Sequence, residues 1–248
     1  PSAPAPFRER LRNVRAYWDT KRHDGVRQIP RSHRGLPVFT SVRNPYDRYV
    51  SRYAFASWKR LDGPVWSRVQ KATVLARFPH FPDLSFEEYV ELSTTFLPRY
   101  RNSPLGVEDR LGWESEELVR SLFRDPEAAW SRLDDTYISN GEWARDLASV
   151  TFLRRETLNR SLYDYLVGSG FSAGDVDFVL EEAPVVPKGS RRDPSRSWQD
   201  WYTPELMAKV RKHERLLFAM FPEYDDASYT RTNSAMTLAS SAHASPDR

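Results

Sequence analysis

The sequence predicts an α/β fold with a parallel β-sheet at its centre. Two short β-rich stretches, residues 35–42 and 147–156, each run directly into a stretch with helical character. A strand followed at once by a helix is the repeating unit of parallel sheets. The first stretch lacks strict apolar–polar alternation, as expected of a strand covered on both faces. Ligands of such sheets bind beyond the carboxyl ends of the strands, where both stretches carry Arg.

Length and composition narrow the class of protein. The 248 residues suffice for one large domain or two small ones, and we expect a single domain over residues 1–224. Residues 225–248 are small and polar, and they predict a disordered tail. The chain has no Cys, which excludes disulfides, thiolate catalysis and Cys-based zinc sites.

The lengths of the apolar runs and the distribution of charge exclude further classes of protein. No run of eighteen apolar residues occurs, so we expect no membrane span, and the lack of a secretory signal predicts a cytoplasmic location. The net charge is +3, and the basic residues are interleaved with acids rather than gathered into a stripe. We therefore expect no nucleic-acid partner. No HExxH, GxSxG or GxGxxG motif is present, and no metal is predicted.

Three helices are predicted in the first hundred residues. Residues 7–22 carry apolar side chains at spacings of three and four. The next helix has Asn44 as its N-cap and Pro45 at its first position, and runs to about Lys59. Residues 85–96 open with the Ser-x-x-Glu spacing of a capping box. The intervening stretches are predicted to be irregular: residues 61–84 and 97–113.

The second half of the chain is predicted to be mainly helical. Its clearest helix spans residues 203–221, with Thr203 as N-cap, Pro204 at the first position and one apolar face. That face carries Leu206, Val210, Leu217, Phe218 and Phe221. Shorter helices are predicted over residues 115–123, 126–133, 157–171 (closed by Gly168) and 172–182.

The junction "VFTSVRNPYDRYVSRYAF", residues 38–55, is the first candidate site. A strand ends at Arg43 and a helix follows, with Ser51 two turns into it. Helix N-termini bind anions through their free N–H groups and the helix dipole, and an Arg fork would face the same place. The alternative is an Arg43 that pairs with Asp47 or Glu156, with Ser51 as an ordinary helical residue.

The segment "VRNPYDRYVSRY" resembles the 3′-phosphate motif of sulfotransferases that use 3′-phosphoadenosine-5′-phosphosulfate (PAPS). In that family a strand ends in Arg-x-Pro, and a Ser eight residues after the Arg shares the 3′-phosphate with it. Arg43 and Ser51 match this pattern in type and spacing. The resemblance therefore assigns Arg43 and Ser51 to cofactor binding. The resemblance to the family extends, with gaps, over about residues 20–224.

A later segment, "KGSRRDPSRSWQDWYTPELMAKV", is similar to the family's C-terminal basic loop, which folds over the same phosphate. The resemblance assigns Lys188, Gly189, Ser190 and Arg191 to cofactor binding. Gly allows close approach of the backbone, and Lys and Arg neutralise phosphate charge. A solvated basic loop is the alternative reading.

The resemblance implies a three-layer sandwich around a central parallel sheet, of the P-loop-containing nucleoside triphosphate hydrolase type. It implies transfer of a sulfuryl group from PAPS to a hydroxyl of a carbohydrate or glycolipid, without a metal. His23 in "TKRHDGV" is the candidate base, because it is similar to the Lys-x-His element of the cytosolic branch. His33 is the second candidate for that role.

One family element is missing from the sequence. Family members carry a Gly-rich loop with Lys, which cradles the 5′-phosphosulfate, upstream of the Arg-x-Pro motif. The forty-two residues before Arg43 contain no such loop. We expect the chain to be N-terminally incomplete. The alternative function is a non-catalytic nucleotide-binding or interaction module that keeps only the 3′-phosphate site.

Overall fold

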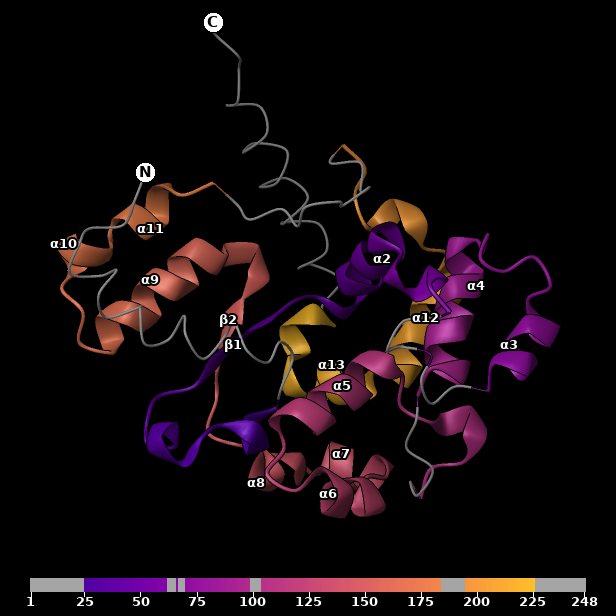
Figure 1. The fold of residues 1–248 in the computed structure, drawn as a ribbon, viewed down its shortest axis with the longest axis horizontal. Coiled ribbons are helices and arrows are strands. Elements are labelled where there is room, and N and C mark those ends of the chain that lie inside the picture. The colour runs from indigo at the N-terminus through magenta and orange to yellow at the C-terminus, as the bar shows by residue number, and fades with distance from the viewer. Residues whose placement is uncertain (1–24, 62–65, 67–69, 99–103, 184–194, 226–248) are drawn as a thin grey trace, which may run out of the picture. The chain divides into compact units, whose positions relative to one another are not determined.

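The computed structural model shows a mixed α/β protein that is mostly helical, with a small two-stranded parallel sheet among the described residues (Figure 1). It describes residues 25–61, 66, 70–98, 104–183 and 195–225. The predicted helix at 7–22 and the predicted tail, apart from Asp225, lie outside them. No helix in these ranges is long and apolar enough to cross a bilayer.

The chain divides into two compact units, which are described separately. Unit 1 comprises Pro1–Arg43, Arg120–Arg124 and Leu147–Pro187. Unit 2 comprises Asn44–Val119, Asp125–Asp146 and Lys188–Arg248. The expectation of one domain over residues 1–224 stays a prediction.

The sheet belongs to unit 1. Strand β1 (Phe39–Val42) pairs in parallel with β2 (Thr151–Arg154), in a register that sets Phe39 opposite Thr151 and Val42 opposite Arg154. The α/β class and the parallel pairing of the two predicted strands are thereby confirmed. Phe39 is 45% exposed, so within the described residues β1 is not covered on both faces as predicted. The three-layer sandwich stays a prediction.

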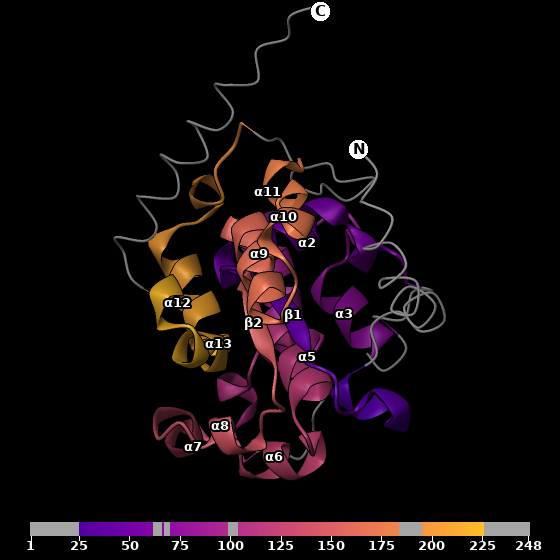
Figure 2. The same cartoon turned by 90° about the vertical axis from the view of Figure 1, so that its left-hand side faces the viewer.

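Helix α9 (Leu158–Gly168) follows β2 and packs against it (Figure 2). Two short helices, α10 (Ala173–Val176) and α11 (Phe178–Glu181), pack on α9 around a small core of Leu166, Val176 and Val179. The helix ends at Gly168 as predicted. The chain then reverses at Gly170, whose φ of 92° lies in the left-handed region that favours glycine.

Helix α2 (Pro45–Phe55) opens unit 2 and begins as the sequence predicts. The Asn44 side chain accepts a hydrogen bond from the Tyr46 amide at 2.9 Å, and Pro45 occupies the first helical position. The helix ends at Phe55 rather than at Lys59. The cause is Ala56, which adopts a left-handed conformation with φ of 58° and ends the α-helix. The residues up to Lys59 form a separate 3₁₀ turn, Ser57–Lys59.

Helix α4 (Phe86–Glu91) has the predicted capping box: the Glu88 amide donates to the Ser85 hydroxyl, and the Ser85 amide donates to the Glu88 carboxylate. A π-helical turn over Leu92–Phe96 continues it. The region predicted to be irregular before α4 contains a short helix, α3 (Lys71–Arg77). The next helices are α5 (Trp113–Leu122), α6 (Pro126–Arg132), α7 (Asp135–Ser139) and α8 (Trp143–Asp146).

The predicted helix at 203–221 is broken in two. Helix α12 (Pro204–His213) starts with Thr203, whose side chain accepts a hydrogen bond from the Leu206 amide. Helix α13 (Arg215–Met220) follows after a break at Glu214, which has φ of −102° and ψ of 22°. The break places Glu214 in the interior of unit 2, where its side chain is fully buried.

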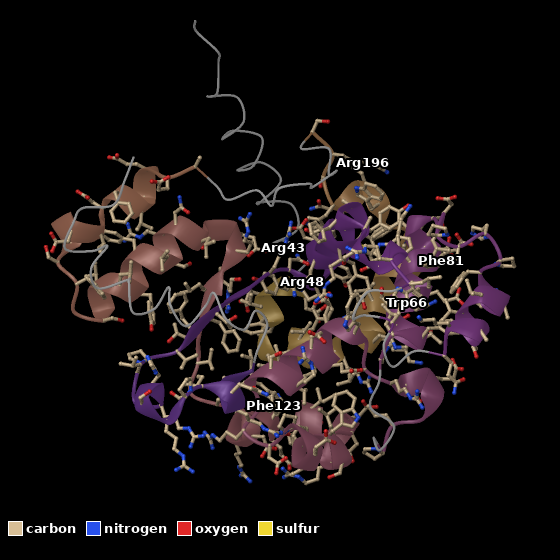
Figure 3. The ribbon with its side chains drawn as sticks, in the orientation of Figure 1. Arg43, Arg48, Trp66, Phe81, Phe123 and Arg196 are labelled. Atoms are coloured by element: carbon tan, nitrogen blue, oxygen red, sulfur yellow. The ribbon has the colours of Figure 1, made fainter. Side chains whose placement is uncertain are left out.

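Helices α2, α4 and α12 pack side by side around an aromatic core (Figure 1). Trp198 stacks on Tyr46 with ring centroids 5.3 Å apart, and Trp201 meets Tyr53 and Phe86 edge-on. Offset and edge-to-face contacts of this kind stabilise a core beyond the burial of area alone. Trp66 and Phe81, labelled in Figure 3, form another edge-on pair with ring centroids 5.2 Å apart.

Candidate functional site

The structure places two of the predicted site residues. Arg43 follows β1 directly and is partly buried in unit 1, whereas Ser51 is a partly buried residue of α2 in unit 2. The boundary between the units falls between Arg43 and Asn44, so each residue is described within its own unit.

The other predicted site residues are mostly outside the described part of the chain: His23, Lys188, Gly189, Ser190 and Arg191. Their assignments stay predictions. His33, the second candidate base, ends a short 3₁₀ turn in unit 1. Its Nδ1 lies 3.0 Å from the Ser32 hydroxyl oxygen.

Within unit 2, the helix that carries Ser51 also carries Arg48 and Arg52. Figure 3 labels Arg48 on α2. Both guanidinium groups bind the carboxylate of Glu114 in α5: Arg48 through Nε, and Arg52 through Nε and, at 3.2 Å, through Nη2. The Glu114 side chain is only 4% exposed, whereas those of Arg48 and Arg52 are 43% and 24% exposed. Two cations therefore share one buried anion, so these three side chains carry one excess positive charge. The charge of Glu117 also acts on Arg52.

The two arginines hold Glu114 in its charged form. Burial alone would raise the pKa of this carboxyl group, but the nearby charges of Arg48 and Arg52 outweigh burial and lower it. The Arg52 guanidinium also lies 4.0 Å from the ring centroid of Trp113, a cation–π contact that fixes its position.

A second buried carboxylate lies at the break between α12 and α13. Glu214 is fully buried and accepts hydrogen bonds from four groups. The Tyr49 hydroxyl donates to Oε1 at 2.5 Å, and the Glu114 amide donates to the same oxygen at 3.2 Å. The amide and hydroxyl of Ser115 donate to Oε2 at 2.7 and 2.6 Å. Glu214 thus joins α2, the N-terminus of α5 and the α12–α13 break.

Glu214 acts as the N-terminal cap of α5 from a distant part of the chain. The Gly112 carbonyl accepts the first helical hydrogen bond of α5, from the Glu116 amide at 3.0 Å, so Gly112 occupies the capping position. Glycine has no side chain to bind the free amides of the first turn. The carboxylate of Glu214 binds two of them instead, and its charge is favourable at a helix N-terminus.

The close approach of Glu214 explains why residue 112 is glycine. A Cβ at this position would lie 2.9 Å from the carboxyl carbon of Glu214 and 3.0 Å from the Tyr49 hydroxyl. Real Cβ atoms do not come that close to buried atoms that cannot move away. Any larger residue would push the carboxylate out of its position.

Two neighbouring carboxyl groups in a buried site do not both ionise easily, and the surroundings decide which one keeps its charge. Glu114 faces two guanidinium groups, whereas Glu214 receives hydrogen bonds from uncharged donors only. Burial, and then the charge of Glu114, raise the pKa of Glu214 to about 7. Burial and the Glu214 charge also raise the pKa of Tyr49, so its hydroxyl keeps its proton.

Contacts around the break hold it against the segment before α5. The Gly112 amide donates to the His213 carbonyl at 2.7 Å, and His213 Nδ1 lies 2.7 Å from the Arg110 carbonyl oxygen. Burial lowers the pKa of His213. Arg215 donates to the Asp109 carbonyl at 2.8 Å and to the Asp135 carboxylate at 2.6 Å. These bonds make the break a defined feature rather than a frayed helix end.

The arrangement offers two chemical properties. The excess positive charge of Arg48 and Arg52 on a partly exposed helix face can attract an anion. A buried carboxyl group that titrates near neutral pH can change the charge behind that face. Within the described residues, no group of three His, Cys, Asp or Glu side chains could hold a metal ion.

Sequence reasoning missed Glu114 and Glu214, although a signal for Glu214 was present. Residue 214 falls on the predicted apolar face of the helix at 203–221, four residues after Val210 and three before Leu217. A carboxylate on an apolar face indicates a buried, hydrogen-bonded group. The sequence held no comparable signal for the shared carboxylate of Glu114.

Comparison with protein-family models, with curated proteins and with solved structures finds no match for the chain.

The capping arrangement predicts a large effect of one methyl group. Gly112→Ala places a Cβ against Glu214 and Tyr49, and we expect it to lower the free energy of unfolding by about 2–4 kcal/mol. Gly106→Ala is the matched control, because an added Cβ there meets nothing within 4 Å. Urea denaturation of both variants tests this, and an equal effect of the two substitutions would contradict the close packing at Gly112.

The raised pKa of Glu214 predicts how stability depends on pH. The folded chain binds a proton at Glu214 that the unfolded chain has released, so the free energy of unfolding falls as pH rises from about 5 to 7. At about 1.4 kcal/mol per pH unit, the full shift amounts to about 3 kcal/mol. His213 acts oppositely, because its lowered pKa makes stability rise with pH below its usual pKa.

The difference between the wild-type chain and Glu214→Gln isolates the Glu214 contribution, since both chains keep His213. We expect the stability advantage of the wild type over this variant to fall by up to about 3 kcal/mol between pH 5 and pH 7.5. Glu205→Gln, an exposed position in the first turn of α12, is the control. An advantage that is constant or rises with pH would show that Glu214 is charged throughout.

Proposed function

We propose that the chain is a sulfotransferase that moves the sulfuryl group of PAPS to a hydroxyl of a carbohydrate or glycolipid. The observation that carries the proposal is the course of the chain at residues 39–55. Strand β1 ends at Val42, Arg43 follows, Asn44 caps α2 through the Tyr46 amide, and Ser51 lies within α2. This order of strand, Arg, capped helix and Ser is the one that the resemblance to the family's 3′-phosphate motif requires.

The parallel pairing of β1 and β2 also supports the proposal. Both strands lead into helices, and Arg43 and Arg154 stand at their carboxyl ends, where parallel sheets bind ligands. In the proposal these two strands belong to the central sheet of a three-layer sandwich of the P-loop-containing nucleoside triphosphate hydrolase type.

The roles of the residues follow from the charge of the co-substrate. Arg43 donates a planar pair of hydrogen bonds to the 3′-phosphate, and the Ser51 hydroxyl donates another. Lys188, Ser190 and Arg191 add donors from the basic loop, where Gly189 lets the backbone approach. None of these interactions needs a metal.

The transfer itself resembles phosphoryl transfer. The acceptor hydroxyl attacks the sulfur in line, and the bond from sulfur to the 5′-phosphate oxygen breaks, which leaves adenosine 3′,5′-bisphosphate. In the proposal His23 takes the proton of the attacking hydroxyl. The negative charge that leaves with the bisphosphate needs cationic donors around it.

The test is calorimetric titration of the chain with adenosine 3′,5′-bisphosphate, with AMP for comparison. We expect micromolar binding that depends on the 3′-phosphate. Arg43→Ala should weaken it about 30- to 100-fold, and Ser51→Ala about 5- to 10-fold, because charged hydrogen bonds are stronger than neutral ones. Arg34→Ala and Ser57→Ala, at exposed positions, are the matched controls.

Equal affinity for AMP and the bisphosphate, or no effect of Arg43→Ala, would contradict the site. Sulfuryl transfer from PAPS to carbohydrate acceptors then separates the two candidate functions. Binding together with transfer supports the enzyme. Binding without transfer to any acceptor supports the nucleotide-binding module.

A further inference from the structure

We propose that Glu214 is a proton-sensitive positioning residue, which acts through Glu114 on Arg48 and Arg52 and so tunes the anion affinity of the α2 face that carries Ser51. The effect on ligand rests on the proposed function. The transmission from Glu214 to the two arginines rests on the contacts within unit 2 alone.

Glu214 can be either ionised or protonated, because its neighbours can form hydrogen bonds with both forms of the carboxyl group. When Glu214 is ionised, both of its carboxylate oxygens accept hydrogen bonds. The Tyr49 hydroxyl donates to Oε1, and the Ser115 hydroxyl donates to Oε2. A hydroxyl can also accept a hydrogen bond. A protonated Glu214 can therefore donate to one of these two oxygens. The site stays hydrogen-bonded in both states, which an arrangement of amide donors alone would not permit.

A short chain of contacts connects this proton to α2. The Glu114 amide donates to Glu214 Oε1, and the Glu114 side chain binds Arg48 and Arg52. The second connection is Tyr49, which donates to Glu214 and precedes Val50 and Ser51 in the same helix. Both connections are buried at their Glu214 end, so solvent screens them weakly there.

The charge balance gives the direction of the effect. Arg48, Arg52, Glu114 and Glu214 together carry no net charge when Glu214 is ionised and one positive charge when it is protonated. The charge of Glu117 also acts on Arg52, so protonation of Glu214 changes the size of the charge around the arginines. Arg48 is the most exposed member, so the added charge reaches solvent on α2. An anion bound there is held more tightly at lower pH.

The other ionisable groups around Glu214 do not cancel this change. Tyr49 in α2, Tyr89 in α4 and Tyr202 before α12 have pKa values raised mainly by burial, so they stay neutral. Next to Glu214 in the chain, His213 has a lowered pKa, and Arg215 is paired with Asp135. His213 therefore loses its proton at a lower pH than Glu214, whose pKa is about 7, and the three tyrosines stay neutral between pH 6 and 8.

The experiment is an NMR titration from pH 5.5 to 8.5 of the full 248-residue chain and of Glu214→Gln. The signals to follow are the amides of Glu114 and Ser115 and the Nε–H groups of Arg48 and Arg52. In the wild-type chain we expect all four to shift with one midpoint near pH 7. In Glu214→Gln, where residue 214 stays neutral, none should shift with this midpoint. Glu205→Gln should behave as the wild type.

The second arm measures the affinity for adenosine 3′,5′-bisphosphate at pH 6 and pH 8 in both chains. The ratio of the two chains' dissociation constants cancels the titration of the ligand's own phosphates. We expect Glu214→Gln to bind about two- to tenfold more tightly than the wild type at pH 8 and equally at pH 6. A ratio that does not change with pH would overturn the effect on affinity.

The two arms separate the proposals. If the amides of Glu114 and Ser115 do not titrate, or if they titrate while the arginine signals stay still, the positioning role is overturned whatever the ligand does. If the arginine signals titrate and neither chain binds the bisphosphate at either pH, the proposed sulfotransferase site fails. In that case the transmission from Glu214 to the arginines stands.

Discussion

The arrangement of unit 2 depends on one buried carboxylate. Glu214 receives hydrogen bonds from α2 and from the first turn of α5, and it does so because the C-terminal helix breaks at this residue. A buried carboxylate without donors would be very unfavourable, so the three segments stay together or separate together. Gly112 makes the approach possible, and the bonds of His213 and Arg215 to residues 109–110 hold the break in place.

This constraint also shapes the surface of α2. Arg48 and Arg52 lie near Ser51 in the helix and would be free to bind an anion if they were unpaired. They instead neutralise Glu114, and only their excess charge is left for a ligand. In the proposed function the strong phosphate contacts therefore come from Arg43 and the basic loop. Arg48 and Arg52 contribute a weaker attraction for the anion, and in the further inference protonation of Glu214 strengthens it.

Local signals predicted the parts of the fold that depend on a few neighbouring residues. The Asn44 cap, the Ser85–Glu88 capping box and the Thr203 cap each involve groups within three residues of each other, and all three are present. The parallel pairing of β1 and β2 followed from two β-rich stretches that lead into helices. The site at Glu214 could not be predicted in this way, because its two hydroxyl partners, Ser115 and Tyr49, lie 99 and 165 residues away in the sequence. The end of α2 at Ala56 was missed too, because nothing in the sequence indicates that this alanine adopts the left-handed backbone conformation.

Hydrogen exchange at the amides of Glu114 and Ser115 tests the central role of Glu214 most directly. The first amides of a helix normally exchange quickly, because they have no helical partner and the end frays. If Glu214 holds the three segments as one unit, these two amides exchange only when the whole unit unfolds. Their free energies of exchange would then equal the free energy of unfolding from denaturant titration. Exchange several orders of magnitude faster, through local opening of the α5 end, would contradict this account.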